Sequence, residues 1–122
     1  MIPDTSVRLG NISINEVLKA RAMVAYVEDS IVIREIVLKP GGSVTIFAFD
    51  EDRSLIEHVT PSDALTQVLE GLMEISIAGT SLLLHAGEML LLPSQAPLSV
   101  KALKRVKIIL TLIQSDPRNG SV

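Results

Sequence analysis

Short apolar runs, each ended within a few residues by a turn signal, fill most of this chain. The run over residues 31–38 is β-branched and apolar, and it stops at Pro40-Gly41-Gly42, a strong turn sequence. Further turns are expected at Gly71, Gly79 and Gly87. No apolar stretch approaches the roughly 18 residues that suggest a membrane span. The pattern therefore predicts many short strands and little helix.

The turn signals delimit eight strands. They cover residues 31–38, 43–49, 64–70, 72–78, 81–85, 89–92, 97–103 and 106–113. Residues 1–13 are expected to form an extended arm, and Asn15–Arg21 is typical of a short helix capped by Ser13 or Asn15. Close turns between strands predict an all-β, single-domain antiparallel sandwich or barrel. The expected division is an arm over 1–30, a barrel over 31–114 and a polar tail over 115–122.

Several of these strands are apolar at both alternating positions. Residues 89–92 read Met-Leu-Leu-Leu, and residues 108–110 read Ile-Ile-Leu. A strand with one face in water should alternate between apolar and polar residues. Both faces of such strands are therefore expected to be covered, and we predict that part of the outer surface meets a second subunit in a homodimer.

Charge and cysteine content exclude several kinds of partner and site. The formal net charge is −3, whereas proteins that bind nucleic acid carry a basic footprint. The chain has no cysteine, which excludes disulfides, thiolate metal sites and cysteine nucleophiles. The beginning of the sequence lacks the basic and apolar regions of a secretion signal. We expect a cytoplasmic protein that binds neither nucleic acid nor a membrane.

One basic cluster stands out from this acidic background. Lys101, Lys104, Arg105 and Lys107 fall within seven residues. We interpret them as a solvated turn between two strands, because no aromatic residue accompanies them to stack on bases. A patch for a phosphate or an acidic ligand is the alternative.

Three segments of the chain resemble the cupin superfamily: residues 68–71, 74–79 and 86–93. The resemblance covers roughly residues 38–113, and it implies a small jelly-roll barrel built from two motifs around a central pocket. The first cupin motif reads Gly, five residues, His-x-His, three or four residues, Glu, six residues, Gly. The second reads Gly, five residues, Pro-x-Gly, two residues, His. In many cupins the three histidines and the glutamate hold a divalent metal.

The first motif keeps its frame but loses most of its ligands. Counting back from Gly71 places His58 in the first histidine position, Thr60 in the second and Ala64 in the glutamate position. One of the four ligand positions of the two motifs is retained.

The second motif is altered in the same way. Gly87 and Pro93 keep the spacing, Gln95 replaces the glycine, and Leu98 stands in the third histidine position. Alanine and leucine supply no donor atom, so the resemblance implies a degenerate metal site and no bound metal.

Asp63 lies next to the lost glutamate position, and it leaves an alternative open. A bulge that turned Asp63 inward would let His58, Asp63 and water hold a divalent ion weakly, as in a metal-dependent dioxygenase or isomerase. The same two residues are candidates for a catalytic dyad, but no nucleophile accompanies them. The sequence therefore favours a protein without catalytic activity.

The two histidines are interpreted differently. His58 is either a group that hydrogen-bonds a ligand or a structural residue. His85 lies outside every ligand position of the cupin motifs and is expected to be structural.

Side chains alternate between the two faces of a strand, so further pocket residues can be predicted along the strand that begins near residue 64. If Ala64 points inward, Thr66 and Val68 follow it, while Leu65 and Leu69 face outward. Thr60, Leu98 and Phe47 or Phe49 complete a largely apolar lumen, which suits a small, weakly polar organic ligand. A filled core without a ligand is the alternative. The candidate ligand-binding residues are His58, Thr60, Asp63, Thr66 and Leu98.

The outward leucines also bear on assembly. Leu65 and Leu69 favour dimerisation, and the alternative is that the N-terminal arm of the same chain covers them. The leading hypothesis is a metal-free cupin-domain protein that binds a small molecule. A non-catalytic protein-interaction module is the second alternative.

Overall fold

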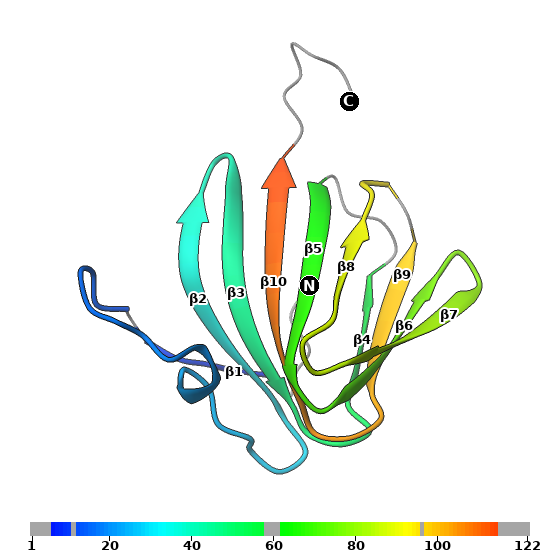
Figure 1. Ribbon diagram of the computed structural model, residues 1–122, viewed down its shortest axis with the longest axis horizontal. Coiled ribbons are helices and arrows are strands. Elements are labelled where there is room, and N and C mark those ends of the chain that lie inside the picture. The colour runs from blue at the N-terminus through cyan, green and yellow to red at the C-terminus, as the bar shows by residue number, and fades with distance from the viewer. Residues whose placement is uncertain (1–5, 11, 58–61, 96, 115–122) are drawn as a thin grey trace.

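The computed structural model describes residues 6–10, 12–57, 62–95 and 97–114, which form two β-sheets (Figure 1). The larger sheet has the strand order β1-β2-β3-β10-β5-β8, and the smaller one has the order β4-β9-β6-β7. The strands are β1 (Ser6–Arg8), β2 (Ile31–Lys39), β3 (Gly42–Phe49), β4 (Ser54–Glu57), β5 (Ser62–Glu70), β6 (Leu72–Ile77), β7 (Thr80–His85), β8 (Met89–Leu92), β9 (Leu98–Ala102) and β10 (Val106–Gln114).

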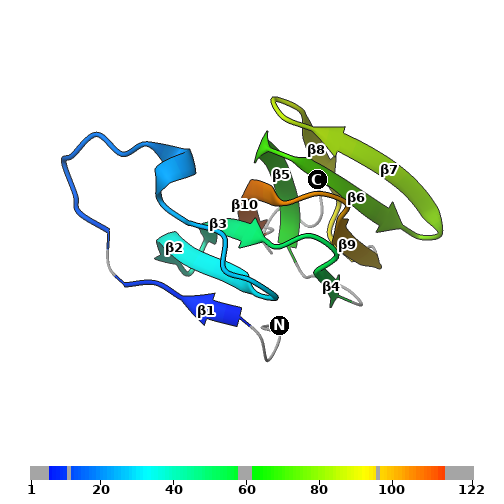
Figure 2. The same ribbon diagram turned by 90° about the horizontal axis from the view of Figure 1, so that it is seen from below.

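The two sheets face each other, and the N-terminal segment lies beside the larger sheet, away from the smaller one (Figure 2). Every strand pair is antiparallel except β1–β2, which is parallel. The expected all-β, antiparallel jelly-roll architecture is confirmed, although the described strands form two separate sheets and not one continuous closed barrel. No helix among the described residues is long and apolar enough to cross a membrane.

The N-terminal region departs from the sequence prediction. The helix expected over Asn15–Arg21 does not form, and a short 3-10 turn, η1, occupies Ala20–Ala22 instead. Asn15 has a φ angle of 65°, a left-handed conformation that interrupts an α-helix. Two short strands, β1 and β4, were not predicted, because three or four residues carry too little periodicity to be recognised.

The main hydrophobic core fills the space between the sheets. In β5 the side chains of Ala64, Thr66 and Val68 are buried, while the residues between them are only partly buried. The predicted alternation along this strand is therefore confirmed. Aliphatic residues and both phenylalanines supply the rest of this core, which includes Ile31, Ile33, Phe47, Phe49, Met73, Ile75, Leu84, Leu92, Ala102, Val106 and Ile108.

A second hydrophobic cluster lies on the outer face of the larger sheet. Val32 of β2 and Ile46 and Ala48 of β3 are buried there beneath Val24, and Leu69 packs against the same cluster. The N-terminal segment thus covers Leu69, as the alternative to dimerisation anticipated. Leu65 is not part of this cluster. The pairing of β2 with β3 shifts by one residue between Glu35 and Val37, a β-bulge just beyond the covered area.

Polar contacts fix this covering segment to the sheet. The Tyr26 hydroxyl donates to Glu70 Oε2 at 2.7 Å, and the Arg105 guanidinium and Lys107 ammonium lie 5.2 and 5.1 Å from the Tyr26 ring centroid. Burial, followed by the hydrogen bond to Glu70, raises the pKa of Tyr26 above its ordinary value. Lys107 Nζ also donates to the Arg21 carbonyl oxygen at 2.7 Å. Two members of the basic cluster therefore serve the fold.

Asp50, which follows β3, holds the end of the covering segment near Asp29. Its Oδ2 accepts the Asp29 N–H at 2.7 Å, and its Oδ1 accepts Arg105 Nε at 2.8 Å and the Glu51 N–H at 2.9 Å. These contacts lower the pKa of Asp50 from 3.8 to about 2, the Asp29 N–H having the largest effect, followed by Arg105 and the Glu51 N–H.

Gly71 ends β5 at a position that only glycine fits. Its φ angle is 92°, and a Cβ there would collide with the backbone carbonyl of Arg105. We expect Gly71→Ala to lower the free energy of unfolding by about 3 kcal/mol or more, measured by urea denaturation. Gly79 has a similar φ of 86°, but a Cβ at this position would meet no atom within 4 Å, so Gly79→Ala should cost only about 1 kcal/mol. Equal losses would contradict the close approach at Gly71.

The contacts of Asp50 predict an acid-sensitive component of stability. A carboxylate whose pKa is lower in the folded chain than in the unfolded chain stabilises the fold above its unfolded pKa, and this stabilisation is lost as the pH falls toward its folded pKa. The wild-type free energy of unfolding should therefore decrease between about pH 4 and pH 2. Asp50→Asn should be less stable at neutral pH and show a smaller decrease in this window. Glu51→Gln, at an exposed neighbour, should follow the wild-type pH profile.

Candidate functional site

A small cavity lies in the lumen between the two sheets. Its volume is about 60 Å³. The lining residues come from six strands: Phe47, Phe49, Leu55, Thr66, Leu92, Leu98, Val100, Ile108 and Leu110. Thr66 supplies the one polar side chain among these described residues.

The size and lining of the cavity define what it can hold. The volume corresponds to about two water molecules, each of which takes about 30 Å³ in the liquid. Aliphatic groups and the stacked rings of Phe47 and Phe49, whose centroids are 5.8 Å apart, form nearly all of the wall. Such a wall favours apolar atoms, while the Thr66 hydroxyl can give or accept a hydrogen bond. The cavity therefore fits a molecule of few atoms with one polar group.

The structure brings two of the five predicted site residues together. Thr66 of β5 and Leu98 of β9 line the same cavity from opposite sheets. Asp63 lies at the alternate, outward position of β5, and its Oδ1 accepts the Ser94 N–H at 2.8 Å. Its carboxylate thus holds the segment between β8 and β9. His58 and Thr60 lie outside the described residues.

Two of the cupin metal-ligand positions, Ala64 and Leu98, lie among the described residues, and their side chains do not fit a bound metal. Ala64, in the glutamate position, is 2% exposed and part of the apolar core, and Leu98, in the third histidine position, packs against that core. Neither hydrocarbon side chain offers a donor atom. Within the part of the chain that the structure describes, no three His, Cys, Asp or Glu residues are grouped closely enough to hold an ion.

Sequence reasoning missed much of the cavity wall. Leu55 belongs to β4, a strand that was not predicted, and its apolar neighbour Ile56 gives the segment no clear alternation. Ile108 and Leu110 lie in a predicted strand that is apolar at both positions, so its inward side could not be identified from the sequence. Val100 lies in β9, where Ser99 and Lys101 alternate with apolar residues, and this alternation could have placed it inward beside Leu98. Only a strand with polar residues on one side reveals its orientation.

His85 is the last residue of β7 and lies at the surface, just before the turn to β8. Its Nδ1 is 3.0 Å from Glu88 Oε1, which also accepts the His85 N–H at 2.7 Å. The hydrogen bond from the His85 backbone, followed by that with its side chain, lowers the pKa of Glu88. These contacts agree with the structural role expected of His85.

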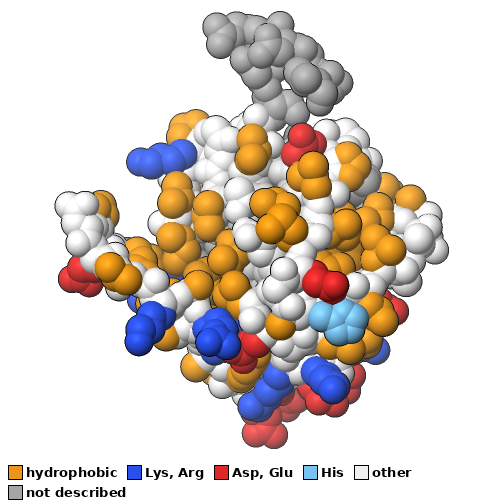
Figure 3. Space-filling view, viewed as in Figure 1, with side chains coloured by type: hydrophobic (Ala, Val, Ile, Leu, Met, Phe, Trp, Pro, Cys, Tyr) orange, Lys and Arg blue, Asp and Glu red, His pale blue; other side chains and the backbone are white. Residues whose placement is uncertain are grey.

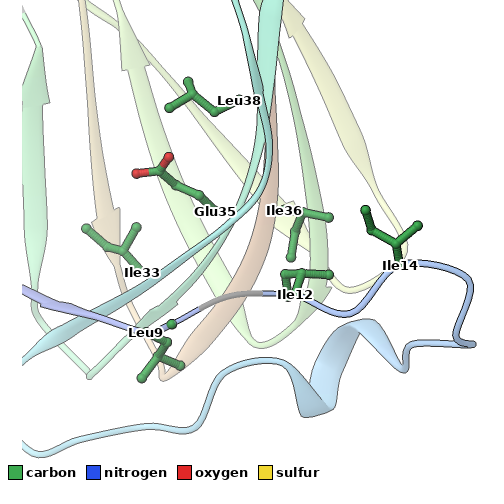
Figure 4. Close-up of a pocket in the computed structure, with 8 residues that line it drawn as sticks. Leu9, Ile12, Ile14, Ile33, Glu35, Ile36 and Leu38 are labelled. Atoms are coloured by element: carbon green, nitrogen blue, oxygen red, sulfur yellow. The ribbon is translucent and has the colours of Figure 1, made fainter.

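An open groove of about 600 Å³ runs between the N-terminal arm and the edge of β2 (Figure 4). Ile12 and Ile14 of the arm lie near Ile36, whereas Glu35 and Leu38 lie on the other side of the β2 ribbon. The remaining lining residues are Leu9, Gly10 and Ile33. Glu35 is the one ionisable side chain among the described lining residues, so the groove assembles no catalytic group of residues.

A scan against protein-family models found no match for this sequence. A search of curated proteins found no match either.

Solved structures match the fold closely. A protein of unknown function from Streptococcus pyogenes is 24% identical, with a TM-score of 0.83 over 89% of this chain and 96% of that chain. A cupin superfamily protein from Desulfitobacterium hafniense is 17% identical, with a TM-score of 0.80 over 89% and 100% of the two chains. A cupin 2 conserved barrel domain protein from Leptotrichia buccalis is 33% identical, with a TM-score of 0.75 over 77% of this chain and 46% of that one.

Three observations agree with the resemblance noted in the sequence. The two sheets face each other, Gly71 and Gly87 have positive φ angles at turns, and solved cupin structures match the fold. This chain therefore has the fold of the cupin superfamily.

Proposed function

We propose that this protein binds a small, weakly polar organic molecule in the lumen between its two sheets, without the help of a metal. The observation that supports the proposal is the apolar cavity with the single hydroxyl of Thr66 in its wall. An apolar wall with few, well-placed polar groups is typical of sites for small organic ligands. The volume of about 60 Å³ restricts the occupant to few non-hydrogen atoms unless the lumen widens.

The residues that line the cavity support ligand binding better than they support catalysis. A reaction needs a nucleophile or a general acid or base beside the substrate. Thr66 has no imidazole or carboxylate among the described residues that line the cavity with it. Asp63, one of the two catalytic candidates, is engaged by the Ser94 N–H on the outward side of β5. A metal-dependent enzyme would need donors at Ala64 and Leu98, which these residues lack.

Thr66→Val provides the test of lumen binding, because it replaces the hydroxyl by a methyl group of similar size. The probes are acetone, which can accept a hydrogen bond, and xenon, which cannot. In the wild type both should cause saturable shifts of the Leu92, Leu98 and Leu110 methyl signals in NMR spectra. Thr66→Val should weaken acetone binding about three- to tenfold, the loss of one hydrogen bond, and leave xenon binding unchanged.

The control is Thr111→Val, which changes a threonine on the outward side of β10 and should affect neither probe. Wild-type methyl signals that do not respond to either probe would refute a binding site in the lumen.

Restoring the lost ligands tests the assignment of the cupin positions. The triple variant Thr60→His, Ala64→Glu, Leu98→His should bind Zn²⁺ or Ni²⁺ more tightly than the wild type in calorimetric titrations, because the four metal-ligand positions that the cupin resemblance implies would then all carry donor side chains. A matched variant with Leu65→Glu in place of Ala64→Glu directs the carboxylate outward and should gain less. A folded triple variant with no gain would show that the positions are wrongly assigned.

A further inference from the structure

A surface hollow lies on the outer face of the smaller sheet, near the turn between β6 and β7. Its volume is about 230 Å³. Ile75 of β6 belongs to the main core and Val100 of β9 packs against it, so the neighbouring Ser76 and Ser99 point outward. These two serines line the hollow from adjacent strands. Its lining also includes Ile56, Ala78, Gly79 and Pro97.

Three hydroxyl groups stand in one row across this face of the sheet. The strand register aligns Ser99 of β9, Ser76 of β6 and Ser81 of β7. The Ser76 and Ser81 hydroxyls share one hydrogen bond at 3.0 Å, so this pair keeps one O–H group free to donate. Within the described part of the chain, no hydrogen bond engages the Ser99 hydroxyl. The row can therefore both donate hydrogen bonds to a ligand and accept hydrogen bonds from it.

Small residues in the β6–β7 turn keep the hollow open. Ala78 and Gly79 have φ angles of 48° and 86°, and a turn with two left-handed residues favours Asn-Gly. Alanine is less favourable in this conformation, because its Cβ approaches the following carbonyl oxygen. Since Ala78 lines the hollow, the longer side chain of asparagine would take up part of this space. A departure from the favoured residue that keeps a space open is typical of a functional site.

The lining of the hollow favours an uncharged ligand with several hydroxyl groups. None of the described lining residues is ionisable, so the hollow offers no charged partner to a phosphate, a carboxylate or an ammonium group. Ile56, which is 57% exposed, and Pro97 add apolar surface beside the serine hydroxyls. A sugar ring carries C–H groups that can pack on such a surface and hydroxyls that can bond to the serines. The hollow has the volume of about eight water molecules, at about 30 Å³ each in the liquid, which is room for one such ring.

The surroundings of the hollow add no net charge. The β6–β7 turn lies at the right edge of Figure 1, and the surface visible at this edge in Figure 3 is formed by hydrophobic, uncharged polar or backbone atoms. The next row on this face of the sheet pairs Lys101 with Glu74. One positive and one negative charge side by side favour neither an anion nor a cation.

We propose that the surface hollow binds one ring of a neutral sugar. The Ser76 and Ser99 hydroxyls would hydrogen-bond to the sugar hydroxyls, while Ile56 and Pro97 would contact its C–H groups. No aromatic ring is present among the described lining residues, so the contacts are few and the dissociation constant should be about 1 mM. The hollow lies on the opposite face of the smaller sheet from the lumen, and this site does not depend on ligand binding there.

Titration with small glycosides tests the site. The probes are the methyl glycosides of glucose, galactose and mannose, and the comparison is cyclohexanol, a ring of similar size with a single hydroxyl. At least one glycoside should cause saturable shifts of the Ser76, Gly79 and Ser99 amide signals in NMR spectra. Cyclohexanol should bind at least about tenfold more weakly, because it leaves hydroxyls of the hollow without partners. Amide signals that respond to none of the glycosides, or equally to cyclohexanol, would overturn the proposal.

Substitutions at Ser99 test its hydroxyl and the space around it. Ser99→Ala should weaken glycoside binding about three- to tenfold, the loss of one hydrogen bond, and Ser99→Leu should abolish binding by filling the hollow. The matched controls are Ser54→Ala and Ser54→Leu, at an exposed serine on the same face of the sheet but outside the hollow. Both controls should bind like the wild type. Ser99 variants that are folded and bind as well as these controls would overturn the assignment.

Ala78→Asn distinguishes a binding role of the turn from a structural one. Asparagine suits the left-handed conformation, so the urea midpoint of unfolding should rise. Glycoside binding should nevertheless weaken at least about threefold, because the longer side chain occupies part of the hollow. Acetone binding in the lumen, measured on the Leu92 methyl signals, should not change in this variant. A stabilised Ala78→Asn variant that binds the glycoside like the wild type would contradict the role given to Ala78.

Discussion

Both faces of the larger sheet are apolar, and the rest of the structure depends on how each face is removed from water. The smaller sheet covers the inner face and forms the main core with it. The segment around Val24 covers part of the outer face, where Ile46 and Ala48 are buried. No described segment covers another part, where the strand register aligns Val37, Val44, Thr111, Leu65 and Leu91. An aliphatic sheet of this kind gains stability from each surface that it buries, so the arrangement of covering elements follows from the hydrophobic effect.

The covering segment has almost no regular secondary structure, so side-chain contacts must hold it in place. Tyr26 supplies an apolar ring that two cations approach and a hydroxyl that donates to Glu70. The Asp50 carboxylate accepts hydrogen bonds from the Asp29 N–H of the segment and from the Glu51 N–H of its own turn. These contacts reassign part of the basic cluster. Arg105 and Lys107 act as anchors within the chain, whereas the sequence alone shows only that they lie near Lys101 and Lys104.

The sequence predicted those features that one short stretch determines. Turn glycines marked the ends of strands. The cupin position assigned to Ala64, carried along β5 by the alternation of its side chains, identified Thr66 as an inward residue. The helix over residues 15–21 was wrong because the backbone of Asn15 is left-handed, a conformation that propensities do not reveal. Local sequence patterns do not predict contacts between segments that are far apart in the chain. Leu55 could not be assigned to the cavity without β4, and the covering of Leu69 depends on residues more than forty positions earlier.

The bulge in β2 divides one hydrophobic surface from another. The extra residue, Ile36, packs with the N-terminal segment, while the next residue, Val37, pairs with Val44 and begins the exposed part of the sheet. Two consecutive side chains can lie on the same side of a strand only where the pleat is interrupted. The gain or loss of a single residue at this point would therefore move the boundary between intramolecular packing and exposed surface. A change in the exposed apolar surface of the larger sheet can thus arise within β2 without any alteration of the lumen.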